Sequence, residues 1–188
     1  MKVLVTGANG FVGRVLCARL KERNFEVRAA VRQRSSMTLE GAVEVGDICE
    51  TTNWVDVLSG SDAVVHLAAL VHDQKLPAHD ARRRYFAVNT EATERLAAAA
   101  VSAGIRRFVF LSTIKVLGDS SGDRPLEESD VPRPHGPYAE SKWQAERALS
   151  AIARTEPLEV AVLRPPLVYG PGVSANFLRL LQDRKSVV

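Results

Sequence analysis

The chain has little of several features that mark special classes of protein. It has only two cysteines in 188 residues, Cys17 and Cys49, and their spacing fits neither a metal site nor a redox pair. No apolar run reaches the roughly 18 residues that span a bilayer, and no basic and apolar leader precedes the first apolar stretch. The sequence contains no internal repeat. We therefore expect a reduced, cytoplasmic protein with buried thiols, no metal and no membrane partner.

A strong excess of one charge is also missing. The chain has 25 basic and 22 acidic residues, a net charge of +3. Its only basic cluster, Arg82, Arg83 and Arg84, stands beside Tyr85 and Phe86 in a helix-like segment, where a solvated helix start explains it better than a nucleic-acid surface. We expect no nucleic-acid partner, and the mild basic excess suits a phosphorylated small molecule equally well.

The apolar pattern alternates between short β-branched runs and longer helical stretches. It predicts strands at residues 3–5, 27–31, 43–45, 63–67, 108–111 and 160–163, and helices at 10–23, 88–103 and 138–153. Such alternation predicts right-handed crossovers and an α/β fold with a doubly wound parallel sheet. The longest irregular segment, residues 118–137, has a length typical of functional loops. We expect one domain over residues 1–172 and the start of a second region over 173–188, with a short helix at 176–183.

Three glycines join the first predicted strand to the first predicted helix. Gly7 permits a tight turn out of the strand, Gly10 lets the backbone approach a pyrophosphate, and Gly13 permits close packing of the helix. The N-terminal amides of that helix would face the anion. The arrangement favours a dinucleotide-binding Rossmann fold over a plain glycine turn.

The end of the second predicted strand is basic. A site for NAD usually places an acidic residue about 20 positions beyond the glycines, where it binds the adenosine ribose. Here that place holds Arg32, with Arg34 and Ser35 close by, and no acid occurs between Val27 and Leu39. A guanidinium suits a 2′-phosphate, so NADP(H) is favoured and NAD(H) stays open. The alternative is that these arginines are merely solvated.

A tyrosine and a lysine open the predicted helix at 138–153. Positions i and i+4 put Tyr138 and Lys142 on one helix face, within reach of a common ligand. A tyrosine has an ordinary pKa of about 10, so a nearby ammonium and a positive nicotinamide ring are needed to stabilise its phenolate near neutral pH. Together the two residues suit acid and base catalysis.

These motifs, in this order, resemble the extended short-chain dehydrogenase/reductase family of NAD(P)-dependent epimerases and dehydratases over residues 1–172. The resemblance implies a catalytic hydroxyl five residues before Gly118, which selects Thr113, with Ser112 as the alternative. Thr113, Tyr138 and Lys142 would then be catalytic. The resemblance implies that the dinucleotide is held by Gly7, Gly10, Phe11, Val12, Gly13, Arg32, Asp47, Ile48, Leu67, Ala68, Ala69, Asn89, Tyr138, Lys142 and Pro165.

Within the family, the residues after Thr113 indicate a subclass. Dehydratases carry Asp-Glu there, whereas this chain has Ile114 and Lys115, which disfavours dehydration. The chain resembles bacterial UDP-sugar 4-epimerases and 4-keto-6-deoxy-sugar reductases, which implies hydride transfer at sugar C4 with a UDP-sugar as substrate. The alternatives are a non-catalytic dinucleotide-binding or sensor module, or an inactive fragment of such an enzyme.

Two departures from the family pattern stand near the end of the chain. Leu167 replaces an asparagine that contributes near the sugar-nucleotide diphosphate, and relatives continue well past Val188. The resemblance therefore implies that the substrate domain is largely absent. Many relatives form homodimers through a four-helix bundle built from the segments matching residues 87–103 and 138–153; the alternative here is a monomer with a core helix.

Overall fold

The structure is a computed structural model, and it describes residues 1–33, 41–48, 52–71 and 77–173. Cys49, Arg34, Ser35 and the helix expected at residues 176–183 lie outside the described residues, as does most of the region expected to begin at residue 173.

Six parallel strands form one sheet. They are β1 (Lys2–Thr6), β2 (Glu26–Val31), β3 (Val43–Glu44), β4 (Ala63–His66), β5 (Arg107–Leu111) and β6 (Glu159–Leu163), in the order β3-β2-β1-β4-β5-β6. The central strand β1 pairs with two strands, so that Val3 lies opposite Val27 of β2 and Ala63 of β4. The expected doubly wound parallel sheet is confirmed.

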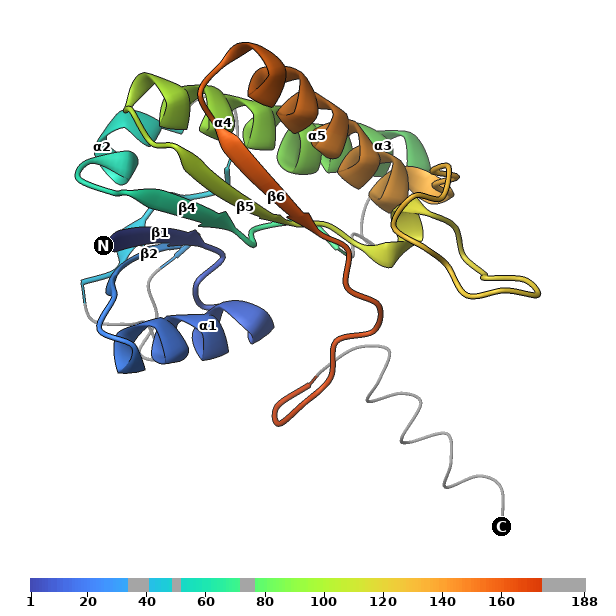
Figure 1. The fold of residues 1–188 in the computed structure, drawn as a ribbon, viewed down its shortest axis with the longest axis horizontal. Coiled ribbons are helices and arrows are strands. Elements are labelled where there is room, and N and C mark those ends of the chain that lie inside the picture. The colour runs from blue at the N-terminus through green and yellow to red at the C-terminus, as the bar shows by residue number, and fades with distance from the viewer. Residues whose placement is uncertain (34–40, 49–51, 72–76, 174–188) are drawn as a thin grey trace.

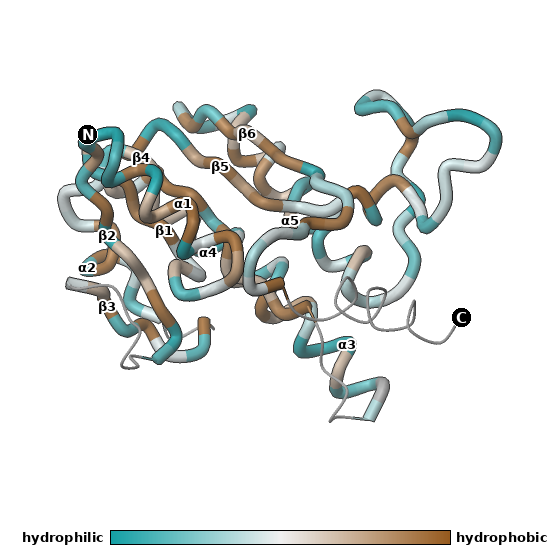
Figure 2. The backbone as a smooth tube through the Cα atoms, turned by 90° about the horizontal axis from the view of Figure 1, so that it is seen from below, coloured by the Kyte–Doolittle hydropathy of each residue, from teal (hydrophilic) through white to brown (hydrophobic). Residues whose placement is uncertain are grey.

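Helices cover both faces of this sheet (Figure 1). The helix α1 (Phe11–Glu22) lies on one face, where Cys17 packs against the apolar side chains of β1 and β2. The opposite face carries α2 (Trp54–Leu58), α3 (Ala78–Phe86), α4 (Ala92–Ser102) and α5 (Gly136–Thr155). The strands follow the hydrophobic segments of the tube in Figure 2, as two-sided burial requires.

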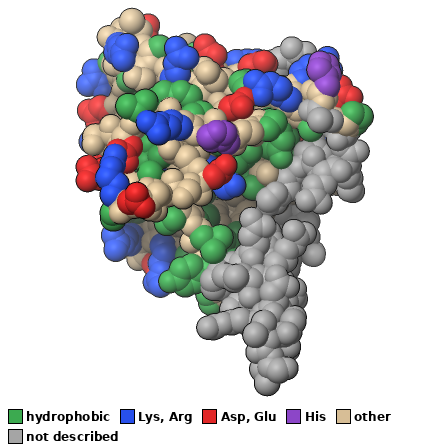
Figure 3. Space-filling view, turned by 90° about the vertical axis from the view of Figure 1, so that its right-hand side faces the viewer, with side chains coloured by type: hydrophobic (Ala, Val, Ile, Leu, Met, Phe, Trp, Pro, Cys, Tyr) green, Lys and Arg blue, Asp and Glu red, His purple; other side chains and the backbone are tan. Residues whose placement is uncertain are grey.

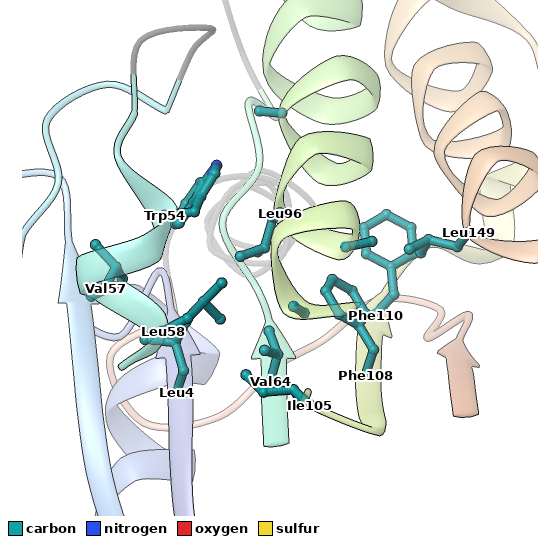
Figure 4. Packing of buried hydrophobic residues seen from close by; sticks show 14 of the residues in the cluster. Leu4, Trp54, Val57, Leu58, Val64, Leu96, Ile105, Phe108, Phe110 and Leu149 are labelled. Carbon is teal, nitrogen blue, oxygen red and sulfur yellow. The ribbon is translucent and has the colours of Figure 1, made fainter. Parts of the chain in front are cut away.

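The main core lies between the sheet and the second group of helices (Figure 4). Phe108 and Phe110 stand two positions apart on β5 and therefore point to the same face of the sheet, toward α4 and α5. There they belong to the same core cluster as Leu96 and Leu149. All four side chains are fully buried. Truncating a buried phenylalanine to alanine typically costs about 3–5 kcal/mol, so β5 anchors this half of the sheet.

The helix before β5 starts earlier than the apolar pattern predicts. Its helical conformation begins with α3, continues through a π-helical turn, η1 (Ala87–Glu91), and ends with α4. The three arginines of the basic cluster lie inside α3, in a segment whose charged residues give no apolar period. The pattern therefore predicts only the part that packs on the core.

Acidic and basic side chains are interspersed on the face of the molecule shown in Figure 3. Among the described residues, no helix is both long and apolar enough to cross a bilayer.

Candidate functional site

A cleft of about 500 Å³ opens at the carboxyl ends of β1, β2, β3 and β4. The chain leaves β1 toward β2 on one side, whereas β4 pairs on its other side, so this is the point where the strand order reverses. Open α/β sheets bind ligands at such points. The cleft is lined by Thr6, Gly7, Asn9, Gly10, Ala30, Arg32, Gln33, Val45, Gly46, Asp47, Ile48, Leu67, Ala68, Ala69, Leu70, Arg84 and Val88.

The glycine turn at the end of β1 leaves no room for side chains. Gly7 has a φ of +65°, and a Cβ there would lie 2.9 Å from the backbone nitrogen of Ala68, which follows β4. A Cβ on Gly13 would lie 2.2 Å from the carbonyl oxygen of Gly7. Gly13 therefore lets the first turn of α1 pack against Gly7. Gly7 in the same way lets the end of β1 approach the residues that follow β4.

The N-terminus of α1 forms one wall of the cleft. Gly10 is its N-cap and offers no side-chain cap, and the first turn has no acidic residue. The amide of Arg14 donates to the carbonyl of Gly10 at 3.1 Å, whereas the amides of Phe11, Val12 and Gly13 precede the first intrahelical bond. This end of the helix therefore presents N–H groups and a positive dipole end that suit a phosphate.

The opposite rim of the cleft holds the two residues expected near the adenosine. Arg32, just after β2, and Asp47, beyond β3, form an ion pair with 3.6 Å between Nη1 and Oδ1. Both side chains are mostly exposed, so this pair is weak and both groups stay accessible to a ligand. Ile48 is buried beside them.

A buried histidine fixes the wall formed by Leu67 and Ala68. Thr93 donates its hydroxyl proton to the carbonyl of Asn89, so it can only accept from Nε2 of His66, at 2.9 Å. The Nδ1 atom is then unprotonated and accepts from the Thr6 hydroxyl at 2.6 Å. The oxygen of Thr6 also accepts from the amides of Leu67 and Ala68, both at 3.2 Å.

These contacts hold His66 in one neutral tautomer. Burial and, to a smaller extent, the charge of Lys142 together lower the pKa of His66 to about 3. Thr6 was not predictable as the partner of His66, because the two residues are 60 positions apart and the pairing of β1 with β4 brings them together.

The side chain of Asn89 links the cleft to α5. Its Oδ1 accepts from the amide of Leu70 at 2.8 Å, and its Nδ2 donates to the carbonyl of Leu70 and to the hydroxyl of Ser141, both at 3.0 Å. Asn89 lies in the π-helical turn η1 and is buried. Ser141 in turn donates to the carbonyl of Tyr138.

At the start of α5, Tyr138 meets the end of β5. A hydrogen bond with the side chain of Thr113 lowers the pKa of Tyr138, but burial has the larger effect and raises it. The ring of Tyr85 from α3 stands edge-on to Tyr138, with 6.3 Å between centroids. Ser112, the alternative hydroxyl, points elsewhere, because it donates to the buried carboxylate of Glu146.

Lys142 lies one turn along α5 and is 1% exposed. Its Nζ stands 3.9 Å from the centroid of the Phe110 ring, a cation–π contact, and the same ring stacks on His66. Burial lowers the pKa of Lys142 to about 7, and the charge of Glu146 opposes this. An ammonium that titrates near neutral pH is typical of functional sites.

The structure thus forms two adjacent groups from the expected site residues. Eight of them line the cleft directly, whereas Thr113, Tyr138 and Lys142 do not line it and lie beyond Leu70 and Asn89. Pro165, after β6, lies next to this second group instead: its carbonyl accepts from the amide of Ile114, which follows Thr113, at 3.0 Å. The described residues contain no cluster of histidine, cysteine or acidic side chains that could hold a metal ion.

Known proteins resemble this chain in sequence. The chain matches the NAD dependent epimerase/dehydratase family over residues 3–184. It is 37% identical over 182 residues to UDP-glucose 4-epimerase of Vibrio cholerae, covering 96% of this chain and 56% of that protein. It is 32% identical over 190 residues to 3 beta-hydroxysteroid dehydrogenase/Delta 5-->4-isomerase of Mycobacterium tuberculosis, covering 97% and 51%.

A solved structure, MoeE5 in complex with UDP-glucose and NAD, superposes with a TM-score of 0.84 at 36% identity, over 97% of this chain and 60% of that one. The chain spans about half the length of the curated relatives it matches. With a family match over nearly all of its residues and a cleft at the switch point of a doubly wound sheet, the chain belongs to the NAD-dependent epimerase/dehydratase family.

Proposed function

We propose that the protein is an NAD(P)-dependent oxidoreductase acting at C4 of a UDP-sugar, as a 4-epimerase or a 4-keto-sugar reductase. The observation that carries the proposal is the contact of Tyr138 with Thr113 at the head of α5, one turn from Lys142 and beside the dinucleotide cleft. The Vibrio cholerae relative, a UDP-glucose 4-epimerase, and the MoeE5 complex with UDP-glucose support this substrate class.

The described residues fit a dinucleotide. Gly7 and Gly10 would let the diphosphate approach the backbone, the first-turn amides of α1 would bind it, and Asp47 with Ile48 would hold the adenine. The bound nicotinamide supplies the hydride acceptor and donor. The ammonium of Lys142 would bind the nicotinamide ribose.

The protein's own side chains would move the proton. Tyr138 takes the proton of the sugar C4 hydroxyl as a phenolate and returns it as a phenol, and Thr113 hydrogen-bonds the same oxygen while charge develops on it. Because burial raises the pKa of Tyr138, the phenolate depends on positive charge nearby, which the ammonium of Lys142 provides.

We infer that NADP(H) is preferred over NAD(H). The preference rests on Arg32 at the rim of the cleft alone. The similar protein MoeE5 carries NAD in its solved complex and so gives no support for NADP(H). Calorimetry with NADPH and NADH tests it. We expect NADPH to bind about tenfold more tightly, and Arg32→Asp to reverse the order, because a carboxylate repels the 2′-phosphate and accepts from the free ribose hydroxyl. Arg14→Asp, on α1, is the matched control. An unchanged ratio in Arg32→Asp would remove the preference.

The reaction type is decided by cofactor balance. If UDP-glucose and UDP-galactose interconvert without net change in NAD(P)H, the protein is an epimerase; if a 4-keto sugar consumes NADPH in stoichiometric amounts, it is a reductase. The likeness to the Vibrio cholerae protein favours epimerisation. A protein that binds the dinucleotide but turns over neither substrate would instead be a sensor module or an inactive fragment.

We also propose a homodimer built from η1, α4 and α5. These helices lie together on one face of the sheet (Figure 1). Trp143 of α5 is half-buried. Light scattering after gel filtration should give twice the mass of one chain for the wild-type protein. The Trp143→Glu variant should give the mass of one chain. A monomeric wild-type protein would reject this proposal.

A further inference from the structure

The proposed chemistry leaves one buried acidic side chain without a role. Glu146 lies on α5, one turn beyond Lys142, and is 5% exposed. Acidic residues are rarely buried unless they are paired, since moving a carboxylate out of water is unfavourable. Its place therefore requires an account in terms of its partners.

Two side chains hold the carboxylate of Glu146 in place. The guanidinium of Arg164 donates from Nε to both oxygens at 3.2 Å and from Nη2 to Oε2 at 2.7 Å. Ser112 donates its hydroxyl to Oε1. This forked pairing raises the pKa of Arg164 and gives the buried carboxylate a partner of opposite charge.

The partners of Glu146 flank the proposed catalytic group. Ser112 directly precedes Thr113, and its amide donates to the carbonyl of Leu163 at 2.7 Å. Arg164 directly precedes Pro165, and also donates to the carbonyl of Glu128 in the long loop. The carboxylate thus sits where α5 meets the ends of β5 and β6.

The ammonium of Lys142 meets different groups from each element packed against it. From β5 it meets the ring of Phe110, from β4 the neutral His66, and along its own helix the charge of Glu146, while Tyr138 lies one turn before it. Of these groups Glu146 is the acidic one, and its carboxylate is paired with the guanidinium of Arg164. Its field opposes the loss of the proton that burial favours.

We propose that Glu146 is a positioning residue that keeps the buried ammonium of Lys142 charged, with Arg164 setting how much of its charge Lys142 senses. The effect on turnover rests on the proposed function, whereas the effect on the proton of Lys142 does not.

The direct test is the titration of Lys142 by NMR in protein labelled at lysine Cε, with its signal assigned by its absence in Lys142→Met. Glu146→Gln, which keeps the shape and removes the charge, should lower the midpoint by about one pH unit. Arg164→Gln, which leaves the carboxylate unneutralised, should raise it. Glu146→Asp, which keeps the charge, should restore most of the wild-type midpoint.

The opposite signs separate this role from a structural one. A loss of packing alone would move both midpoints the same way or leave both unchanged, and either result, in variants with a wild-type far-UV spectrum, would overturn the proposal. If Glu146→Gln does not fold, Arg164→Gln decides alone, because an unmoved midpoint there contradicts the role given to it.

Turnover supplies the second readout. With UDP-glucose, Glu146→Gln should lower kcat about tenfold at pH 8.5 but only about twofold at pH 6, where the wild type keeps most of its ammonium and the variant about half. Equal losses at both pH values would contradict the proposal. If the wild-type protein turns over no UDP-sugar, the proposed function fails, and the lysine titration still decides the role of Glu146.

Discussion

Two glycines six residues apart stand where a single methyl group would collide with the backbone. Gly7 needs its positive φ and its contact with Ala68, and Gly13 needs its contact with Gly7. Neither contact involves a side chain that could move aside. The glycine turn is therefore a packing requirement of the apoprotein as well as an approach path for phosphate.

Gly13→Ala should destabilise the protein by about 2 kcal/mol, although alanine is the better helix former, because its Cβ would lie 2.2 Å from the carbonyl oxygen of Gly7. Gly10→Ala is the matched control. Its φ of −74° suits alanine and its Cβ would lie 3.1 Å from the same oxygen, so we expect a loss of about 1 kcal/mol or less. Urea unfolding followed by circular dichroism measures both, and an equal loss would contradict this reading of the turn.

Lys142 is the residue where stability and function oppose each other. Its pKa in the folded protein, about 7, is below the ordinary value of 10.5, so between these values the unfolded chain binds more protons than the folded one. Stability from this group therefore rises with pH above 7 and is flat below it, where the ammonium is charged in both states.

At pH 7, Lys142→Met should accordingly have a free energy of unfolding about 1–3 kcal/mol higher than the wild type in urea titrations, because it removes a buried charge. Between pH 7 and pH 8.5 the gap should narrow by about 1–2 kcal/mol. The matched control is Lys115→Met, at an exposed lysine near Thr113, which should stay within about 0.5 kcal/mol of the wild type at both pH values. A difference in the free energy of unfolding that does not change with pH would show that Lys142 has the same pKa in the folded and the unfolded protein.

At the scale of elements, the π-helical turn η1 brings Asn89 into a position that connects three segments. The turn adds a residue to the helix between α3 and α4, and Asn89 within it reaches both backbone groups of Leu70 and the hydroxyl of Ser141. Such turns are frequent at functional sites. Here it ties the wall of the cleft to the helix that carries Tyr138.

Asn89→Ala should therefore cost about 3 kcal/mol, since it leaves the buried groups of Leu70 and Ser141 without partners. The neighbouring Thr90→Val loses one hydrogen bond, to the carbonyl of Ser141, and should cost about 1 kcal/mol. Thermal unfolding compares the two. Equal costs would mean that the side chain of Asn89 does not hold the segments together.

The elements themselves were largely predictable from the sequence. All six strands follow runs of apolar residues, and the glycine turn identifies where the first one ends. The basic cluster indicated a helix start near Arg82, but α3 begins earlier, at Ala78, because its charged residues have no apolar period. The π-helical turn η1 was not predictable either, since nothing in the pattern of residues 87–91 separates a π-helical turn from an α-helical one.

At the scale of the whole molecule, the sheet order follows from rules of topology, whereas the buried polar network does not. Strands separated by helices predict a parallel sheet, and the glycine turn predicts the switch point. The tautomer of His66 depends on side chains 27 and 60 positions away in the sequence. The two side chains that hold Glu146 lie 18 and 34 positions away. A clue for Glu146 was its spacing from Lys142, which puts an acid on the buried face of α5.

The central claim is that Tyr138 acts as the acid and base for hydride transfer, and that its hydroxyl contributes little to dinucleotide affinity. The most direct measurement is the single-turnover change in nicotinamide absorbance on mixing the full-length protein with UDP-glucose, for wild type and Tyr138→Phe. The account predicts a rate about a thousandfold lower in Tyr138→Phe, with dinucleotide affinity within about threefold of wild type. A rate within threefold of wild type would contradict it.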